Sequence, residues 1–174
     1  MRDRPPPGRR EFQPGRRPPG QPPRPPAATL PQDYLRAGYF DSDGNLRPEL
    51  VGAVAQTVAQ TIRSDRIGGR EPMAYGQLRG FWSFTQAIRN RLGLEGSFAE
   101  VKADIQQLSA KAAYAVSREV APPVFKDFID RNVALALESP DAFRKGFIRH
   151  FEAVICFFRY SEFRQRAAQA AARR

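Results

Sequence analysis

Cysteine and histidine are almost absent from this chain of 174 residues, which contains one of each. A single cysteine, Cys156, has no partner for an internal disulfide, so a secreted fold framed by disulfides is excluded. A single histidine, His150, leaves too few ligands for a structural zinc site, which takes about four. The sequence also lacks a run of about 18 apolar residues, so we expect no transmembrane helix. Because the N-terminus has no apolar core of the kind found in signal peptides, we expect a soluble cytoplasmic protein.

Recognisable catalytic motifs are missing as well. The sequence contains no Gly-x-x-x-x-Gly-Lys phosphate loop and no Gly-x-Ser-x-Gly nucleophile elbow. His150 has only Glu152 as a neighbouring carboxylate in the sequence, so we interpret it as a histidine at a helix surface or interface. Cys156 lies in the most apolar run of the chain, which favours a small buried side chain over a reactive thiol. We therefore predict no catalytic residue, no metal, no cofactor and no enzymatic activity.

Acidic residues are too few to balance the basic ones, since 28 Lys and Arg face 18 Asp and Glu and give a net charge of +10. Residues 1–29 hold 10 of the 16 prolines, and seven arginines against two acids. That stretch has almost no apolar side chains to bury, so we expect a disordered, basic, Pro-rich arm. Residues 30–174 are predicted to form a single helical domain. The excess of positive charge predicts an anionic partner.

A turn is predicted near the start of this domain, over residues 41–45. The sequence there reads Asp-Ser-Asp-Gly-Asn, and such residues favour tight turns. It also resembles the opening of a calcium loop, which needs Gly at its sixth place and Glu at its twelfth. Leu46 and Gly52 occupy those places. We therefore predict a plain turn.

Helical periodicity extends over most of residues 48–160. Apolar residues recur every three or four positions, and Pro and Ser stand where helices commonly begin. Five helices are predicted, which start near Pro48, Met73, Ser97, Pro122 and Ser139. We expect the third to shift register near Leu108–Ser109, with Ala113 turned inward and Ala115 outward, and the fifth to be enclosed on almost every side. No segment alternates with a period of two, so the predicted fold is all-α, a compact bundle of about five helices whose last ten or so residues fray.

Two of these helices carry polar faces opposite their apolar stripes. On the second helix that face consists of Arg79, Ser83, Gln86 and Asn90, within a stripe about 60° wide. On the third, Lys111 and Arg118 align and Tyr114 flanks them, while Arg89 and Arg91 add charge to the second. Cations, hydrogen-bonding groups and a ring together are suited to phosphates along a flexible strand. Solvated helix faces have the same composition, so periodicity alone leaves both interpretations open.

Four segments of the chain, in order, resemble one known family. Residues 33–50 read Asp-Tyr-Leu-x-x-Gly-Tyr-Phe-Asp-x-x-Gly-Asn-Leu-x-Pro-Glu-Leu. Then follow Gln77-Leu78-Arg79-x-Phe81, Lys111-Ala112-Ala113-Tyr114-Ala115-Val116-Ser117-Arg118 and Phe147-x-x-x-Phe151-Glu152-Ala153-Val154-Ile155. Over about residues 29–160 the chain resembles the small subunit of the type III-A CRISPR effector, the Csm complex. Two departures stand out: Gly80 occupies a position that is usually basic in the family, and the arm has no family counterpart.

The resemblance implies a non-catalytic helical subunit that lines the channel holding the guide RNA (crRNA) paired to its target RNA, through contacts with the RNA backbone. The partners it implies are crRNA, target RNA, other subunits of the effector and further copies of the chain, with no membrane. By matching position it implies that Arg79, Lys111 and Arg118 face RNA, with Gln77 and Tyr114 beside them. Arg89 and Arg91 are candidate RNA-binding residues from charge alone.

Two other classes of protein remain as alternatives. One is a helical nucleic-acid-binding regulator, which would use a helix-turn-helix, but no two predicted helices are joined by a turn of the right length. The other is a structural adaptor without RNA contact, whose basic faces meet acidic protein surfaces. RNA and duplex DNA binding across a salt series distinguishes these hypotheses.

Overall fold

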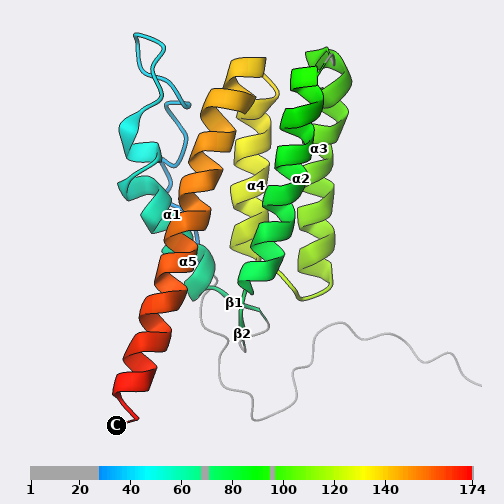
Figure 1. The fold of residues 1–174 in the computed structure, drawn as a ribbon. Helices are drawn as coiled ribbons and strands as arrows, with labels where there is room; N and C mark the ends of the chain where they lie inside the picture. Colours follow the sequence, from blue (N-terminus) through cyan, green and yellow to red (C-terminus); the bar gives the residue numbers. More distant parts are fainter. Residues whose placement is uncertain (1–27, 68–70, 95–96, 174) are drawn as a thin grey trace, which may run out of the picture.

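The computed structural model describes residues 28–67, 71–94 and 97–173 (Figure 1). Apart from Ala28 and Thr29, the predicted basic arm lies outside the described residues. The described chain forms the helices α1 (Ala53–Ser64), α2 (Tyr75–Leu94), α3 (Phe98–Ser117), α4 (Pro123–Ala136) and α5 (Ile148–Ala171). A 3-10 helix, η1 (Pro48–Leu50), precedes α1, and a π-helical segment, η2 (Ala142–Phe147), leads directly into α5. The prediction of an all-α fold with five helices is confirmed.

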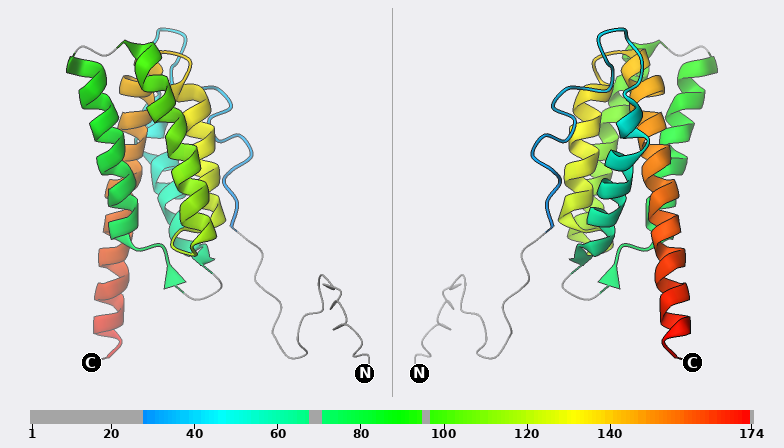
Figure 2. Two further views of the ribbon diagram at one scale, coloured as in Figure 1. Left: turned by 90° about the vertical axis from the view of Figure 1, so that its right-hand side faces the viewer. Right: turned by 90° about the vertical axis from the view of Figure 1, so that its left-hand side faces the viewer.

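The long helices α2 to α5 lie side by side, as Figure 1 shows. Helix α2 packs between α3 and α5, while α4 packs on α3 and α1 packs on α5. Between α1 and α2, strands β1 (Arg66–Ile67) and β2 (Glu71–Pro72) form a two-residue antiparallel hairpin that the sequence did not predict. The C-terminal part of α5 extends past the end of the bundle on the side of this hairpin (Figure 2).

The core of the bundle is built largely from phenylalanine. The side chains of Phe125, Phe128, Phe143, Phe147, Phe151 and Phe158 are fully buried. The ring of Phe151 lies 5.6 Å from that of Phe147 and 5.4 Å from that of Phe128, measured between centroids. Aromatic pairs at such distances add to the free energy gained by burying the rings. The phenylalanine stripes predicted for the fourth and fifth helices are therefore confirmed as core.

The segment before α1 crosses the bundle and is fixed by buried hydrogen bonds. Asn132 of α4 donates through Nδ2 to the hydroxyl of Tyr34 at 2.7 Å, and the hydroxyl of Tyr39 donates to Asn132 Oδ1 at 2.8 Å. Tyr34 in turn lies 2.7 Å from Nε2 of His150 on α5. Downstream, Asp41 Oδ1 accepts from two backbone N–H groups, which confirms the predicted turn.

His150 and Cys156 both differ from the sequence prediction. His150, expected at a surface or interface, is fully buried, because Tyr34 and the carbonyl of Leu50 hydrogen-bond its two ring nitrogens. Cys156, expected to be buried, is exposed. It is two positions from both Val154 and Phe158, which face the core, so it falls on the opposite side of α5. The expectation that this helix is enclosed on almost every side is therefore wrong.

The predicted register shift in the third helix is wrong, because α3 runs unbroken from Phe98 to Ser117. An unbroken helix continues the buried series Leu108, Ala112 and Ala115 at spacings of four and three, so Ala115 is buried and Ala113 is exposed. At the other end of the chain, α5 is helical as far as Ala171. Fraying of its last turns concerns the stability of that end and stays a prediction.

Candidate anion-binding surfaces

The structure brings four of the seven predicted RNA-binding residues together and separates the other three. The pocket between α2 and α3 is lined by Gln77, Lys111, Tyr114 and Arg118, and we call it the α2–α3 pocket. Arg79 is two positions from Gln77, which on a helix is about 200° of rotation, so it lies on another side of α2. Arg89 lies on a different surface, and Arg91 is ion-paired.

The α2–α3 pocket has a volume of about 240 Å³ and sets two cations beside aromatic rings. Lys111 Nζ lies 4.4 Å from the ring centroid of Phe84, and Arg118 Cζ lies 5.5 Å from that of Tyr114. Among the described residues neither cation forms an ion pair. The ring of Tyr114 is an exposed member of the pocket, with 63% of the residue accessible. Cations held against rings keep their charge available to a ligand.

The local sequence explains this arrangement. Lys111, Tyr114 and Arg118 follow one another at spacings of three and four, which place them on one face of α3. The helix ends at this site, where Arg118 donates its N–H to the Tyr114 carbonyl and Glu119 adopts a left-handed φ of 54°. Opposite them Gly80 borders the pocket, and a Cβ there would meet nothing within 4 Å. A Cβ at position 80 therefore fits without a clash.

Arg91 and Arg79 do not belong to this pocket. Arg91 Nη1 lies 2.5 Å from Asp104 Oδ2 of α3, so a carboxylate already neutralises much of its charge. Arg79 is exposed and, within the part of the chain that the structure describes, has no hydrogen-bond or ion-pair partner. Arg79 lies on the same side of α2 as Asn90, and on the opposite side from Gln77.

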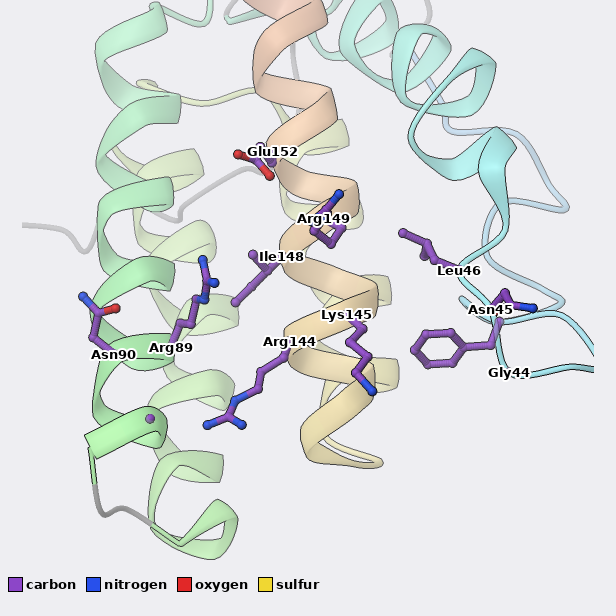
Figure 3. Close-up of a pocket in the computed structure, with 12 residues that line it drawn as sticks. Gly44, Asn45, Leu46, Arg89, Asn90, Arg144, Lys145, Ile148, Arg149 and Glu152 are labelled. Atoms are coloured by element: carbon purple, nitrogen blue, oxygen red, sulfur yellow. The ribbon is translucent and has the colours of Figure 1, made fainter.

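A second cationic surface, which we call the basic groove, was largely missed by the sequence analysis. Its floor is the outer face of η2 and the start of α5, and its walls are α2 and the turn at residues 40–46. Arg89, Arg144, Lys145 and Arg149 line this groove of about 1300 Å³ (Figure 3). Only Arg89 was a candidate. Arg144, Lys145 and Arg149 fall within six residues of the sequence and could have indicated a cationic surface here. They did not, because the fifth helix was expected to be enclosed.

The π-helical turn η2 positions the floor of the basic groove. Such a turn holds one residue more than an α-helical turn, which buries Phe143, Gly146 and Phe147 while Arg144 and Lys145 remain exposed. Arg144 donates through Nη2 to the carbonyl of Leu92 at 2.9 Å, which ties η2 to the end of α2. Single-turn π-helices occur frequently at functional sites.

No group of three or more His, Cys, Asp or Glu side chains in the described ranges is arranged to hold a metal ion. In the same residues no helix is both long and apolar enough to cross a bilayer. What both cationic surfaces offer is positive charge next to apolar or aromatic side chains, an arrangement suited to holding an anionic macromolecule.

These features define a class, a small basic helical protein with two cationic surfaces. Comparison with known proteins makes it specific: the family model for Csm2 type III-A matches residues 47–164, more than half of the chain. The chain therefore belongs to the Csm2 type III-A family, the small subunit of the Csm effector complex. The resemblance found in the sequence is confirmed at the level of the family. Neither the curated proteins nor the solved structures contain a significant match.

Proposed function

We propose that this chain is a non-catalytic subunit that lines the RNA channel of the type III-A effector, together with the other subunits and further copies of itself. The channel holds crRNA paired to target RNA, and the α2–α3 pocket contacts the RNA backbone. The base sequence is read by the guide, so this chain needs only to recognise phosphate and ribose. Family membership and the composition of the pocket support the proposal.

The observation that carries the proposal is the environment of Lys111 and Arg118. Each cation rests against an aromatic ring instead of a carboxylate. On α4, in contrast, Lys126 and Arg131 are each paired with an aspartate four positions away. A cation without an acidic partner neutralises a phosphate without first losing an ion pair, so the net gain on binding is larger.

Tyr114 and Gln77 complete the proposed contact. The exposed ring of Tyr114 supplies an apolar surface for a ribose or an unpaired base, and the amide of Gln77 supplies a neutral hydrogen-bond donor. Because Arg79, Arg89 and Arg91 do not line this pocket, we assign them no contact with the same phosphates. Arg79 was predicted to face RNA from its match to the family motif, and Arg89 and Arg91 from their charge alone.

The test compares two double variants that remove the same charge. Lys111→Ala/Arg118→Ala empties the pocket of cations, and Lys126→Ala/Arg131→Ala removes two paired cations from α4. Binding to labelled oligouridine is measured across a salt series. Each phosphate contact on a single strand contributes about 0.7 to the salt slope, so the pocket variant should lower the slope by about 1.4. At about 50 mM salt it should also bind more weakly, while the α4 variant stays close to wild type.

Equal losses for unrelated RNA sequences are expected, because backbone contacts carry no base information. If the pocket variant keeps the wild-type slope and affinity, the cations form a solvated face and the adaptor hypothesis replaces this one. If the loss is confined to certain sequences, the pocket reads bases and the channel-lining role is wrong. A preference for duplex DNA over RNA would instead favour the regulator.

A further inference from the structure

The outer face of α5 continues the floor of the basic groove toward the C-terminus. Arg149, Glu152, Cys156, Tyr160 and Phe163 follow one another at spacings of three and four, so they lie along one side of the helix. All five are exposed. Tyr160 is 54% and Phe163 67% accessible, and both count among the few large hydrophobic residues that are exposed in the described chain. Cationic groove and aromatic helix face thus form one continuous surface.

This surface has groups of both signs as well as apolar area. Arg149 and Glu152 have no hydrogen-bond or ion-pair partner among the described residues, although they stand one turn apart. Phe40 and Leu46 contribute partly buried apolar side chains to the wall of the groove. Aromatic residues and arginine are the types enriched in protein–protein interfaces. A phosphate backbone, in contrast, carries one sign of charge and is repelled by Glu152.

We propose that the basic groove and the outer face of α5 together bind an acidic, amphipathic segment of a partner protein. The acidic residues of that segment lie against Arg144, Lys145 and Arg149, and its apolar residues cover Tyr160 and Phe163. Charge complementarity identifies the partner as acidic, because four cations and one carboxylate line the groove. Of these cations only Lys145 has an ion-pair partner within the described residues, namely Asp141. A second copy of the chain is disfavoured as the occupant, since the protein carries a net charge of +10.

The proposed surface is separate from the α2–α3 pocket. Gln77 and Gly80 of α2 border the pocket, whereas Arg89 and Asn90 border the groove, and the two pairs lie on different sides of the helix. RNA in the pocket and a protein segment on the groove can therefore be bound at the same time. Loss of one contact does not require loss of the other.

The single cysteine allows a direct test, because Cys156 lies in the middle of the proposed surface and is exposed. A benzophenone maleimide attached to Cys156 is irradiated in the reconstituted type III-A complex, and the cross-linked product is mapped by mass spectrometry. We expect a cross-link to an acidic segment of another protein subunit. A cross-link to RNA, to a second copy of the chain, or to its own N-terminal residues would each overturn the proposal, as would a complex that assembles without any cross-link.

Charge-reversal variants decide whether the mapped segment is held by the groove. Lys145→Glu/Arg149→Glu should lower the yield of the cross-link about tenfold, while Arg36→Glu/Lys102→Glu, which changes the net charge equally elsewhere, should leave it unchanged. Tyr160→Ser/Phe163→Ser should also lower the yield. Circular dichroism of each variant confirms that it folds, and oligouridine binding of the groove variant should match wild type. Equal yields from the groove variant and its control would overturn the proposal.

Discussion

The hydroxyl of Tyr34 donates to Nε2 of His150 at 2.7 Å, across 116 positions of sequence and in the buried interior. The direction follows from the neighbours. Asn132 Nδ2 donates to the Tyr34 oxygen, so the phenolic proton is left for the histidine. His150 then accepts at Nε2 and donates from Nδ1–H to the carbonyl of Leu50. This pair fastens the segment before α1 to the helix that carries the core.

Tyr34→Phe should destabilise the protein, because it leaves the Nε2 atom of His150 and a donor of Asn132 buried without a partner. An unsatisfied buried polar group costs about 1–3 kcal/mol. Urea denaturation measures the change in the free energy of unfolding. Tyr75→Phe is a suitable control, since that tyrosine has no buried hydrogen bond to any other residue that the structure describes. Equal destabilisation by the two variants would contradict the assignment.

Stability should fall as the pH drops from about 6.5 toward 4, because burial lowers the pKa of His150 to about 4 from its usual 6.5. Between these values the unfolded chain binds a proton that the folded protein does not, so acid favours unfolding and the full stability returns above pH 6.5. The loss between about pH 8 and pH 5.5 should be about 1.4 kcal/mol. His150→Gln should show a correspondingly smaller loss over this interval. A wild-type profile parallel to that of the variant would show that His150 titrates freely.

Phe151→Ala should cost about 3–5 kcal/mol, since its ring is fully buried among Phe128, Phe147 and Trp82. Thermal unfolding measures the effect. Phe163→Ala on the exposed side of the same helix is the matched control and should change stability by about 0.5 kcal/mol or less. Melting of the Phe151 variant within a degree or two of wild type would contradict the core assignment.

Gly146→Ala should destabilise the fold, because a Cβ at this position would overlap the ring of Tyr39. Overpacking of this kind costs about 1–3 kcal/mol. Gly80→Ala, in contrast, meets open space within α2 and should be neutral or stabilising by up to about 1 kcal/mol. The opposite signs of the two changes, measured by denaturation, are the expected result. A Gly146→Ala variant as stable as wild type, or more stable, would mean that Tyr39 does not pack on Gly146.

Gly80→Lys should strengthen RNA binding if the α2–α3 pocket lies on the RNA backbone. The substitution places a third cation at the border of the pocket, next to Lys111 and Arg118. One additional phosphate contact should raise the salt slope for oligouridine by about 0.7. Gly80→Gln is the control for helix propensity and should leave the slope unchanged. A rise of equal size in both variants would attribute the effect to the helix instead of the charge.

Helix positions were predictable from the sequence because they depend on neighbours three and four positions away. Ser97 caps α3 by accepting from the N–H of Glu100, as the capping box predicts. Lys111, Tyr114 and Arg118 came together for the same reason, since one helix face fixes all three. Arg79 was assigned to RNA by its motif, but it lies two positions from Gln77, and on a helix that spacing is a rotation of about 200°, slightly more than half a turn.

Burial of His150 was not predictable from its neighbours, because its partners are Tyr34 and the carbonyl of Leu50, each at least 100 positions away. A polar side chain becomes a core residue only when distant groups satisfy its hydrogen bonds. The basic groove escaped prediction for a related reason. A uniform rotation of 100° per residue misplaces Arg144 and Lys145, since the turn that carries them is π-helical.

The π-helical turn makes the number of residues in this part of the chain as important as their chemistry. Deleting one residue between Ala142 and Phe147 would convert the turn to an ordinary α-helix without removing any cation from the groove. A π-helical turn accommodates its extra residue locally, so the segments on either side of the deletion would keep their orientation and only the side chains of the turn would shift. Arg144 and Lys145 would keep their charge, but their side chains would point in different directions. A relative of equal basicity but one residue shorter here would therefore present a different surface to its partner.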